Sequence, residues 1–178
     1  MTNLLAMDES VRTNASRMIG QRLLQVANDA HYIMAFWPLP SEPDITGALE
    51  DLISRGKCLS LPWIKGNSIT PLSVNDFTTL IHSNLGVYTP DPTKSEELPS
   101  EKLDLVIVPG LAFTTSCERL GRGGGYYDRF LSGLPSSAAK VAVAFDVQLL
   151  SSIPTEIHDT SVNSIITEST IHDQHADH

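Results

Sequence analysis

Cysteine is scarce in this chain of 178 residues, which contains only Cys58 and Cys117. Two cysteines are too few for a disulfide framework, and their separation matches no zinc-ligand spacing. We therefore expect two free thiols. Cys58 fits a small core residue, whereas Cys117 lies close to a glycine-rich segment and has no obvious base beside it in the sequence.

Long apolar runs and an excess of basic residues are also missing. No apolar run approaches the roughly 20 residues that cross a bilayer, and the sequence opens without a basic-then-apolar signal pattern. Lysine and arginine total 12 against 21 aspartate and glutamate, which gives a net charge of −9. A surface of that sign repels nucleic acid and anionic lipid. We expect a cytoplasmic protein that binds neither nucleic acid nor membrane.

The length suits one α/β domain with a sizeable core and is too short for two full ones. We predict a single domain over residues 1–178, acting as a monomer, with a polar tail at about 169–178 that is disordered. His172, His175 and His178 recur at intervals of three in this tail. Histidines so placed belong more often to an unstructured segment than to a metal site.

Apolar periodicity and breaker residues divide the chain into alternating helices and strands. The pattern predicts a helix at 10–26, a strand at 32–36, a helix at 43–56 with Pro43 in its first turn, a strand at 58–61 that Pro62 stops, an extended segment at 68–74, a short helix at 76–81, a loop at 86–101, and strands at 105–108, 140–145 and 162–166. This alternation is typical of an α/β fold with a largely parallel sheet flanked by helices.

The most informative stretch is residues 119–129, which read Arg-Leu-Gly-Arg-Gly-Gly-Gly-Tyr-Tyr-Asp-Arg. Glycines at four of five positions let a backbone adopt positive φ and turn its N–H groups toward one point, which is how phosphate oxygens are held. The buried strand at 105–108 precedes this stretch and a helix follows it, and phosphate sites lie beyond the carboxyl ends of such strands. A glycine-rich surface turn is the ordinary alternative, and the flanking arginines favour the phosphate site.

Several short blocks together resemble one enzyme family. They are Asp-Leu-Val-Ile-Val-Pro-Gly-Leu-Ala-Phe at 104–113, the glycine-rich block at 119–131, Ala-Phe-Asp-Val-Gln at 144–148, Ile-Pro at 153–154, His-Asp at 158–159 and Ile-Ile-Thr-Glu at 165–168. With the proline-containing loop at 36–45, they resemble 5-formyltetrahydrofolate cyclo-ligase, also called methenyltetrahydrofolate synthetase. The resemblance extends over about residues 18–168.

The resemblance implies a small-molecule substrate, 5-formyltetrahydrofolate, whose ring closes to 5,10-methenyltetrahydrofolate in a reaction that depends on ATP and Mg²⁺ and releases ADP and phosphate. It also implies a three-layer α/β/α arrangement similar to that of sugar-phosphate isomerases and CoA transferases. Phosphoryl transfer is mostly positioning and charge neutralisation, which suits a glycine loop flanked by arginines.

The resemblance further assigns roles to the glycine-rich block. The implied ATP contacts are Arg119, Gly121, Arg122, Gly123, Gly124, Gly125, Tyr126 and Tyr127. The same loop would face the folate through Arg122, Gly123, Gly124, Gly125 and Tyr126. The implied catalytic residues are Arg119, Arg122 and Tyr126, because arginines offset the charge that builds up in transfer.

Outside the loop, the resemblance implies that Glu42 and Trp37 bind the folate and that Asp128 and Asp159 bind Mg²⁺. A carboxylate suits the paired N–H donors of a pterin, and an aromatic face can stack on a flat ring. Mg²⁺ prefers one or two carboxylates together with phosphates. From the residues alone, a helix-start carboxylate is the favoured interpretation of Asp128 and a turn residue that of Asp159, and a core position is as good an interpretation of Trp37 as a folate contact.

The sequence departs from the family pattern in two places. Relatives carry a Lys-x-x-x-Arg pair at the start of the first helix, farther upstream of the loop glutamate than this sequence extends before Glu42. Either the true start of the protein lies upstream of Met1, or other cations, such as Arg12 or Arg17, take the place of the Lys-x-x-x-Arg pair. Relatives also read Phe-Asp-x-x-Gly where this chain has Thr114 and Cys117.

These departures leave a competing interpretation open. Loss of the family aspartate at Thr114 removes a possible loop anchor, and loss of the glycine at Cys117 demands a backbone conformation that a non-glycine residue can adopt. A relative that binds folate or nucleotide with weakened or no catalysis is therefore the second hypothesis. An isomerase or transferase is a third, disfavoured because the glycine block holds no candidate general base.

Overall fold

The computed structural model describes residues 7–84, 86–156 and 158–174. Its helices are α2 (Glu9–Val26), α3 (Thr46–Ser54) and α4 (Tyr126–Ser132), with 3-10 turns η1 (Ser100–Lys102) and η2 (Asp146–Gln148). Its strands are β1 (Tyr32–Met34), β2 (Cys58–Lys65), β3 (Ser68–Ser73), β4 (Leu80–His82), β5 (Tyr88–Pro90), β6 (Leu105–Val108), β7 (Ala112–Phe113), β8 (Arg119–Leu120), β9 (Ala139–Val143), β10 (Ser164–Ile166) and β11 (Ile171–Asp173).

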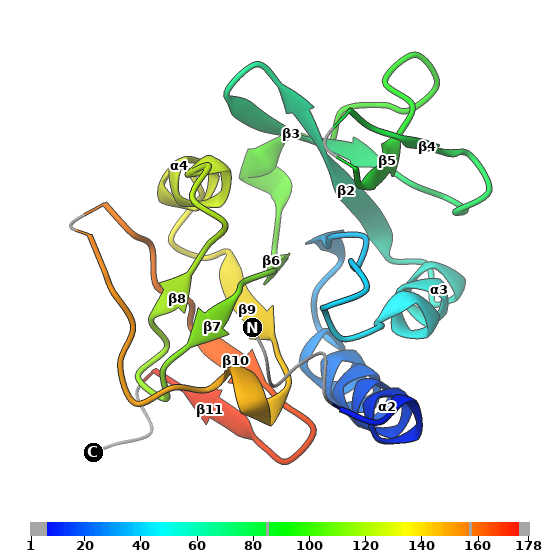
Figure 1. Cartoon of the computed structure of the whole chain (residues 1–178). Coiled ribbons are helices and arrows are strands. Elements are labelled where there is room, and N and C mark those ends of the chain that lie inside the picture. The colour runs from blue at the N-terminus through cyan, green and yellow to red at the C-terminus, as the bar shows by residue number, and fades with distance from the viewer. Residues whose placement is uncertain (1–6, 85, 157, 175–178) are drawn as a thin grey trace.

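A seven-stranded sheet forms the centre of the molecule, in the order β11-β10-β9-β6-β1-β2-β3. The pairs from β10 through β2 are parallel, and only the edge strands β11 and β3 pair antiparallel. Figure 1 shows α2 and α3 side by side along one part of the sheet, with α4 on the opposite side. This arrangement confirms the predicted α/β fold with a largely parallel sheet.

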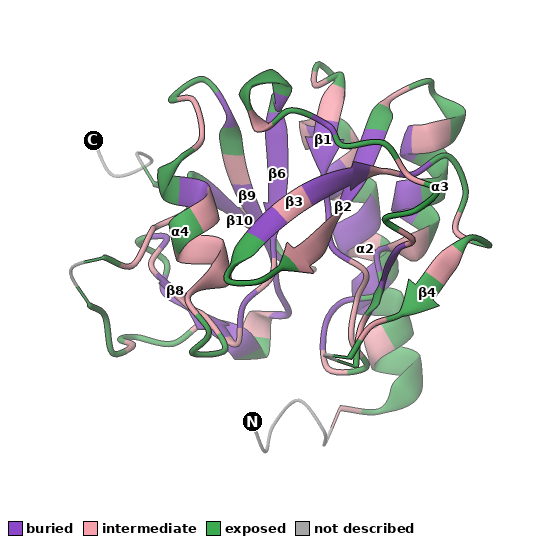
Figure 2. Ribbon diagram, turned by 90° about the horizontal axis from the view of Figure 1, so that it is seen from above, coloured by how far each residue is buried: buried purple, intermediate pink, exposed green. Residues whose placement is uncertain are grey.

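Strand β6 shows why the sheet is covered on both faces. All four of its residues are buried, and alternate side chains point to opposite faces. Leu105 and Ile107 belong to the core that packs under α2 and α3, whereas Val106 and Val108 belong to the core beneath α4. The buried strands lie between exposed helix surfaces in Figure 2. Within the described residues, no helix is long and apolar enough to cross a bilayer.

Three predictions near the middle of the chain are wrong. Pro62 does not stop β2, because beyond Ser60 the strand no longer pairs with β1 and needs ladder bonds only toward β3. The helix predicted at 76–81 is absent; the Asp76 carboxylate accepts hydrogen bonds from the N–H and hydroxyl of Thr78, which closes a turn instead. Strand β4 follows this turn and pairs with β5, and it is β5 that lies inside the segment 86–101 predicted as a loop.

The predicted disordered tail is wrong for Ile171–Asp173, which form β11 and pair with β10. An edge strand is held by main-chain hydrogen bonds, so polar side chains such as His172 do not prevent it. His175 and His178 lie outside the described residues. Cys58 is also not a core residue, because it opens β2 at the exposed amino end of the strand.

Arg22 on α2 fastens the turn between β10 and β11, since its guanidinium donates to the carbonyl oxygens of Thr167, Glu168 and Ser169 at 3.3, 2.5 and 2.9 Å. We expect Arg22→Ala to lower the free energy of unfolding by about 2 kcal/mol, because three carbonyls lose a charged donor. Urea denaturation measures the change. Arg17→Ala, which removes only a bond to Asn14 in the same helix, is the control; equal losses in both variants would contradict the prediction.

Candidate active site

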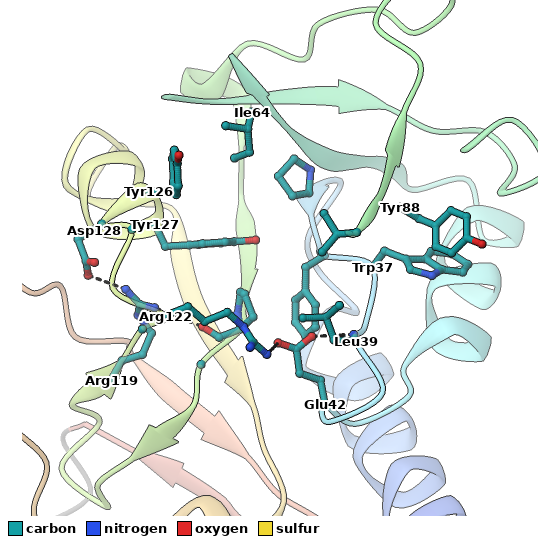
Figure 3. Close-up of a pocket in the computed structure, with 18 residues that line it drawn as sticks. Trp37, Leu39, Glu42, Ile64, Tyr88, Arg119, Arg122, Tyr126, Tyr127 and Asp128 are labelled. Atoms are coloured by element: carbon teal, nitrogen blue, oxygen red, sulfur yellow. Dashed lines mark hydrogen bonds and ion pairs between the residues drawn. The ribbon is translucent and has the colours of Figure 1, made fainter. Parts of the chain in front are cut away.

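A cavity of about 380 Å³ lies at the carboxyl ends of the parallel strands. Three chain segments form most of its wall: the loop after β1, the middle of β2, and the stretch that leads from β6 through the glycine-rich loop into α4. Figure 3 shows these walls facing one another, with Arg119, Arg122, Tyr126, Tyr127 and Asp128 on one side. Trp37, Leu39 and Glu42 face them from the other side.

The glycine-rich loop has the predicted backbone character. Gly123 and Gly125 have φ of 85° and 61°, in the left-handed region that favours glycine. Gly125 is the N-cap of α4 and offers no side chain to cap it. At Gly124 an added Cβ would come within 2.7 Å of the Tyr126 ring. Three successive positions therefore require glycine for local reasons, and the loop they form lines the cavity.

Arg119 and Asp128 form an ion pair beneath this loop. The Nη2 atom of Arg119 lies 2.5 Å from Oδ1 of Asp128, and Nη1 donates to the carbonyl of Pro109 at 3.3 Å. Arg119 is 4% exposed. The phosphate contact of Arg119 stays a prediction, whereas the structure shows that this cation pairs with the carboxylate predicted to bind Mg²⁺.

The structure brings the chain around Asp159 next to Asp128. The N–H of Thr160 donates to Asp128 Oδ1 at 3.3 Å, while Asp159 itself accepts from the N–H of Glu156 at 2.6 Å. Asp159 does not line the cavity. Among the described residues, no three His, Cys, Asp or Glu side chains are grouped to hold a metal. The role of the two aspartates in Mg²⁺ binding stays a prediction.

Glu42 is joined to the glycine-rich loop across the cavity. Arg122 Nη2 donates to Glu42 Oε1 at 3.0 Å, and the N–H of Leu39 donates to Oε2 at 2.9 Å. The carboxylate side chain is 5% exposed and that of Arg122 is 45% exposed. A buried carboxylate thus has one partner on its own loop and one partner across the cavity whose side chain is accessible to solvent.

Trp37 occupies neither a full core position nor a free surface. It is partly buried, and its ring meets the rings of Phe77 and Tyr88 edge-on at centroid distances of 5.0 and 6.2 Å. Tyr88 and Val87 also line the cavity, as does Ile64 of β2. Sequence reasoning missed these three residues because their segments lack a motif and reach the cavity only through the β2–β5 packing.

The backbone at Cys117, just before the glycine-rich loop, differs from the conformation expected for a residue that is not glycine. Its φ is 67°, the only positive value at a non-glycine residue in the described part of the chain. Cys117 thus has a left-handed backbone although it is not a glycine, and two hydrogen bonds hold it there. Its N–H donates to the Thr114 carbonyl at 2.9 Å, and its carbonyl accepts from the N–H of Val162 at 3.0 Å. The buried thiol faces the carbonyl of His172 at 3.6 Å.

Thr114, at the position of the family aspartate, bonds within its own hairpin. Its hydroxyl accepts from the N–H of Glu118 at 3.3 Å and bonds to the Glu118 carboxylate at 2.9 Å. The Thr114 hydroxyl thus closes the β7–β8 hairpin that leads into the glycine-rich loop. Of the two arginines proposed as substitute cations, Arg12 donates to the Pro40 carbonyl at 2.6 Å and Arg17 to Asn14 at 2.8 Å; neither lines the cavity.

The two thiols should differ sharply in reactivity. Burial, with the nearby carboxylate of Asp173, raises the pKa of Cys117 to about 11 from its ordinary 9.0, whereas Cys58 is exposed. Since the thiolate is the nucleophile, iodoacetamide at pH 8 should alkylate Cys58 and spare Cys117 until the protein unfolds. Peptide mass spectrometry reads this out, with Cys58→Ser as the control. Equal alkylation of both thiols in the folded protein would contradict the prediction.

The same pKa shift makes stability depend on pH. Because folding raises its pKa, the Cys117 thiol binds its proton more tightly in the native state than in the unfolded state. Its contribution to the free energy of unfolding is therefore fully present below pH 9 and is lost as the pH rises toward 11.

Comparison with known proteins agrees with the geometry. The sequence model of the 5-formyltetrahydrofolate cyclo-ligase family matches residues 1–168. The 5-formyltetrahydrofolate cyclo-ligase of Mycolicibacterium smegmatis is 30% identical over 175 residues, which cover 94% of this chain and 89% of that protein. The Escherichia coli K12 enzyme of the same name is 30% identical over 146 residues, 80% of each chain.

Solved structures agree as well. The 5,10-methenyltetrahydrofolate synthetase of Aquifex aeolicus superposes with a TM-score of 0.86 at 26% identity and covers 99% of this chain and 90% of its own. The synthetase of Mycoplasma pneumoniae, at 18% identity, supports the fold alone with a TM-score of 0.76, over 94% and 93% of the two chains. With the family match spanning nearly all of the sequence, the chain belongs to the 5-formyltetrahydrofolate cyclo-ligase family.

Proposed function

We propose that this protein cyclises 5-formyltetrahydrofolate to 5,10-methenyltetrahydrofolate with ATP and releases ADP and phosphate. The observation that carries the proposal is the cavity in which a glycine-rich loop with two arginines faces a buried glutamate across an apolar floor. Such a cavity can hold an anionic phosphate chain against one wall and a flat, hydrogen-bonding heterocycle against the other.

The chemistry explains why both ligands must share one site. A formamide oxygen is a poor leaving group, so it attacks the γ-phosphorus of ATP and the bond to ADP breaks. The second folate nitrogen then attacks the activated carbon, loses its proton, and the carbon–oxygen bond breaks to release phosphate. Backbone N–H groups of 121–125 hold the phosphates, and Arg119 and Arg122 offset the charge that develops in transfer.

Glu42 and Trp37 form the folate side of the proposed site. The Glu42 carboxylate already accepts from Leu39 and Arg122, so its orientation is set before the ligand arrives. The pterin's adjacent N–H groups take the place of the Arg122 guanidinium, and that cation turns toward the phosphates. Trp37, held by Phe77 and Tyr88, offers an apolar surface beside the heterocycle.

Asp128 and Asp159 would hold Mg²⁺ in this scheme. Both are oxygen donors, and Thr160 brings their chain segments together beside the loop. Two carboxylates completed by phosphate oxygens suit this hard cation, which would neutralise charge on the phosphate chain. The Arg119 guanidinium holds the Asp128 carboxylate in place. A monomer in the cytoplasm remains our prediction for the assembly and location of the protein.

The proposal is tested by mixing the purified protein with 5-formyltetrahydrofolate, ATP and Mg²⁺ and recording the absorbance of methenyltetrahydrofolate. The account predicts growth of that absorbance only when all three are present. Tight folate binding without ATP-dependent turnover would support the second hypothesis, a binding protein, and overturn the ligase.

A further inference from the structure

Tyr127 carries a polar atom that the fold leaves unsatisfied. Its hydroxyl oxygen is shielded from solvent and has no hydrogen-bond partner among the described residues. Tyr127 lines the cavity, and Figure 3 shows its ring extending from α4 into the space between the glycine-rich loop and the loop after β1. Buried hydroxyls are nearly always paired, because an unpaired one costs about 1–3 kcal/mol. A ligand in the cavity is the natural source of the missing partner.

The ring is held in this orientation from below. The Arg119 guanidinium lies 5.9 Å from the ring centroid, and it is fixed in turn by Asp128 and the Pro109 carbonyl. A phenol is ordinarily protonated near neutral pH, so the Tyr127 hydroxyl has a proton available for donation.

The surroundings of the hydroxyl favour a neutral ligand group over phosphate. Glu42 acts electrostatically on Tyr127, and the cavity wall contributed by Phe36, Pro62 and Ile64 is apolar. A phosphate chain beside a buried carboxylate would meet like charge in a medium of low dielectric constant. A flat heterocycle whose N–H groups pair with Glu42 presents instead a ring carbonyl, which is an acceptor for a neutral donor.

We propose that the Tyr127 hydroxyl positions the folate by donating a hydrogen bond to the ring carbonyl oxygen of the pterin whose N–H groups pair with Glu42. The inference rests on the proposed function and deepens it, because it assigns this side chain to the folate, whereas the family resemblance implies a contact with ATP. Tyr127 thus becomes a specificity-determining residue for pterins that carry this oxygen.

Removing the hydroxyl should move stability and binding in opposite directions. In Tyr127→Phe the ligand-free protein loses an unsatisfied buried group, so its melting temperature should rise by a few degrees. Its affinity for 5-formyltetrahydrofolate should fall about tenfold, since a ligand acceptor is left without its donor. A residue that serves only the fold would lower the melting temperature, and one that serves the nucleotide would lower affinity for ATP.

The experiment measures folate affinity and nucleotide affinity separately, by calorimetry with 5-formyltetrahydrofolate alone and with ATP and Mg²⁺ alone. Tyr32→Phe is the matched control, because this tyrosine lies in β1 under Lys102 and does not line the cavity. We expect weaker folate binding only in Tyr127→Phe, with ATP affinity within twofold of the unsubstituted protein.

The possible outcomes distinguish the assignment of Tyr127 from the proposed reaction. Unchanged folate affinity in Tyr127→Phe, a lower melting temperature, or a loss confined to ATP would overturn the assignment of Tyr127 even if the unsubstituted protein turns over. Absence of methenyl product from the unsubstituted protein, with folate binding that still falls in the variant, would overturn the proposed reaction and leave the assignment standing. No folate binding by the unsubstituted protein would overturn both.

Discussion

Asp128→Asn should lower the turnover number by about 100- to 1000-fold, the size of effect expected when one charged group is lost from a site that neutralises phosphate. Asparagine has the shape of aspartate, so its oxygen can still accept from Arg119 and from the Thr160 N–H. The negative charge that would hold Mg²⁺ is gone. Initial rates measured over a range of Mg²⁺ concentrations, with circular dichroism to verify folding, give the result.

Asp159→Asn distinguishes the effect on turnover from the effect on stability. Asp128→Asn also leaves the buried Arg119 without its counter-charge, so we expect a lower melting temperature in addition to slower turnover. The described contacts pair Asp159 with no cation, so Asp159→Asn should slow turnover at nearly unchanged stability. Asp91→Asn, at an exposed turn beside Lys94, is the control. Undiminished turnover in both site variants would refute the proposed metal ligands.

Glu42→Gln should weaken binding of 5-formyltetrahydrofolate by about 100-fold while ATP affinity changes little. The amide can still accept from the Leu39 N–H, so the loop after β1 should keep its shape. It can no longer receive two N–H donors as a charged, bidentate acceptor. Arg122 is half-exposed, and water can replace its lost partner without a large cost in stability.

Calorimetry with each ligand alone checks the Glu42 prediction. Glu156→Gln serves as a control, since this glutamate pairs with His158 on the exposed surface. If Glu42→Gln weakened ATP and left folate affinity intact, the assignment of the two sides of the cavity would be reversed. An equal loss of affinity for both ligands would show that the Glu42–Arg122 pair maintains the shape of the cavity and does not recognise the pterin specifically.

Much of the central fold follows from local patterns. Strand β6 is a continuous apolar run bounded by Pro109, and α2 has regular apolar spacing, so both were predictable without knowledge of their neighbours. The elements that were missed or misplaced include β4 and β5, which form a separate two-stranded sheet, and β11, a short strand at the edge of the central sheet. Their stability comes from main-chain bonds to partners that no local pattern identifies, and the course of β2 through Pro62 depends likewise on β3.

In the candidate site, too, local features were predictable and features that depend on tertiary packing were not. The glycine-rich loop was predictable because the need for positive φ at Gly123 and Gly125 is a local property of the backbone. The Glu42–Arg122 pair joins residues 80 positions apart, and only the packing of β1 beside β6 brings them together. Cys117 runs against the local rule, since tertiary hydrogen bonds hold a left-handed backbone that its residue type disfavours.

The most direct test of the central claim is the fate of the formyl oxygen. We would supply 5-formyltetrahydrofolate labelled with ¹⁸O in the formyl group, together with ATP and Mg²⁺, and analyse the released phosphate by mass spectrometry. The account predicts one labelled phosphate and one ADP for each methenyltetrahydrofolate formed. Unlabelled phosphate, or cyclisation without ADP, would contradict it.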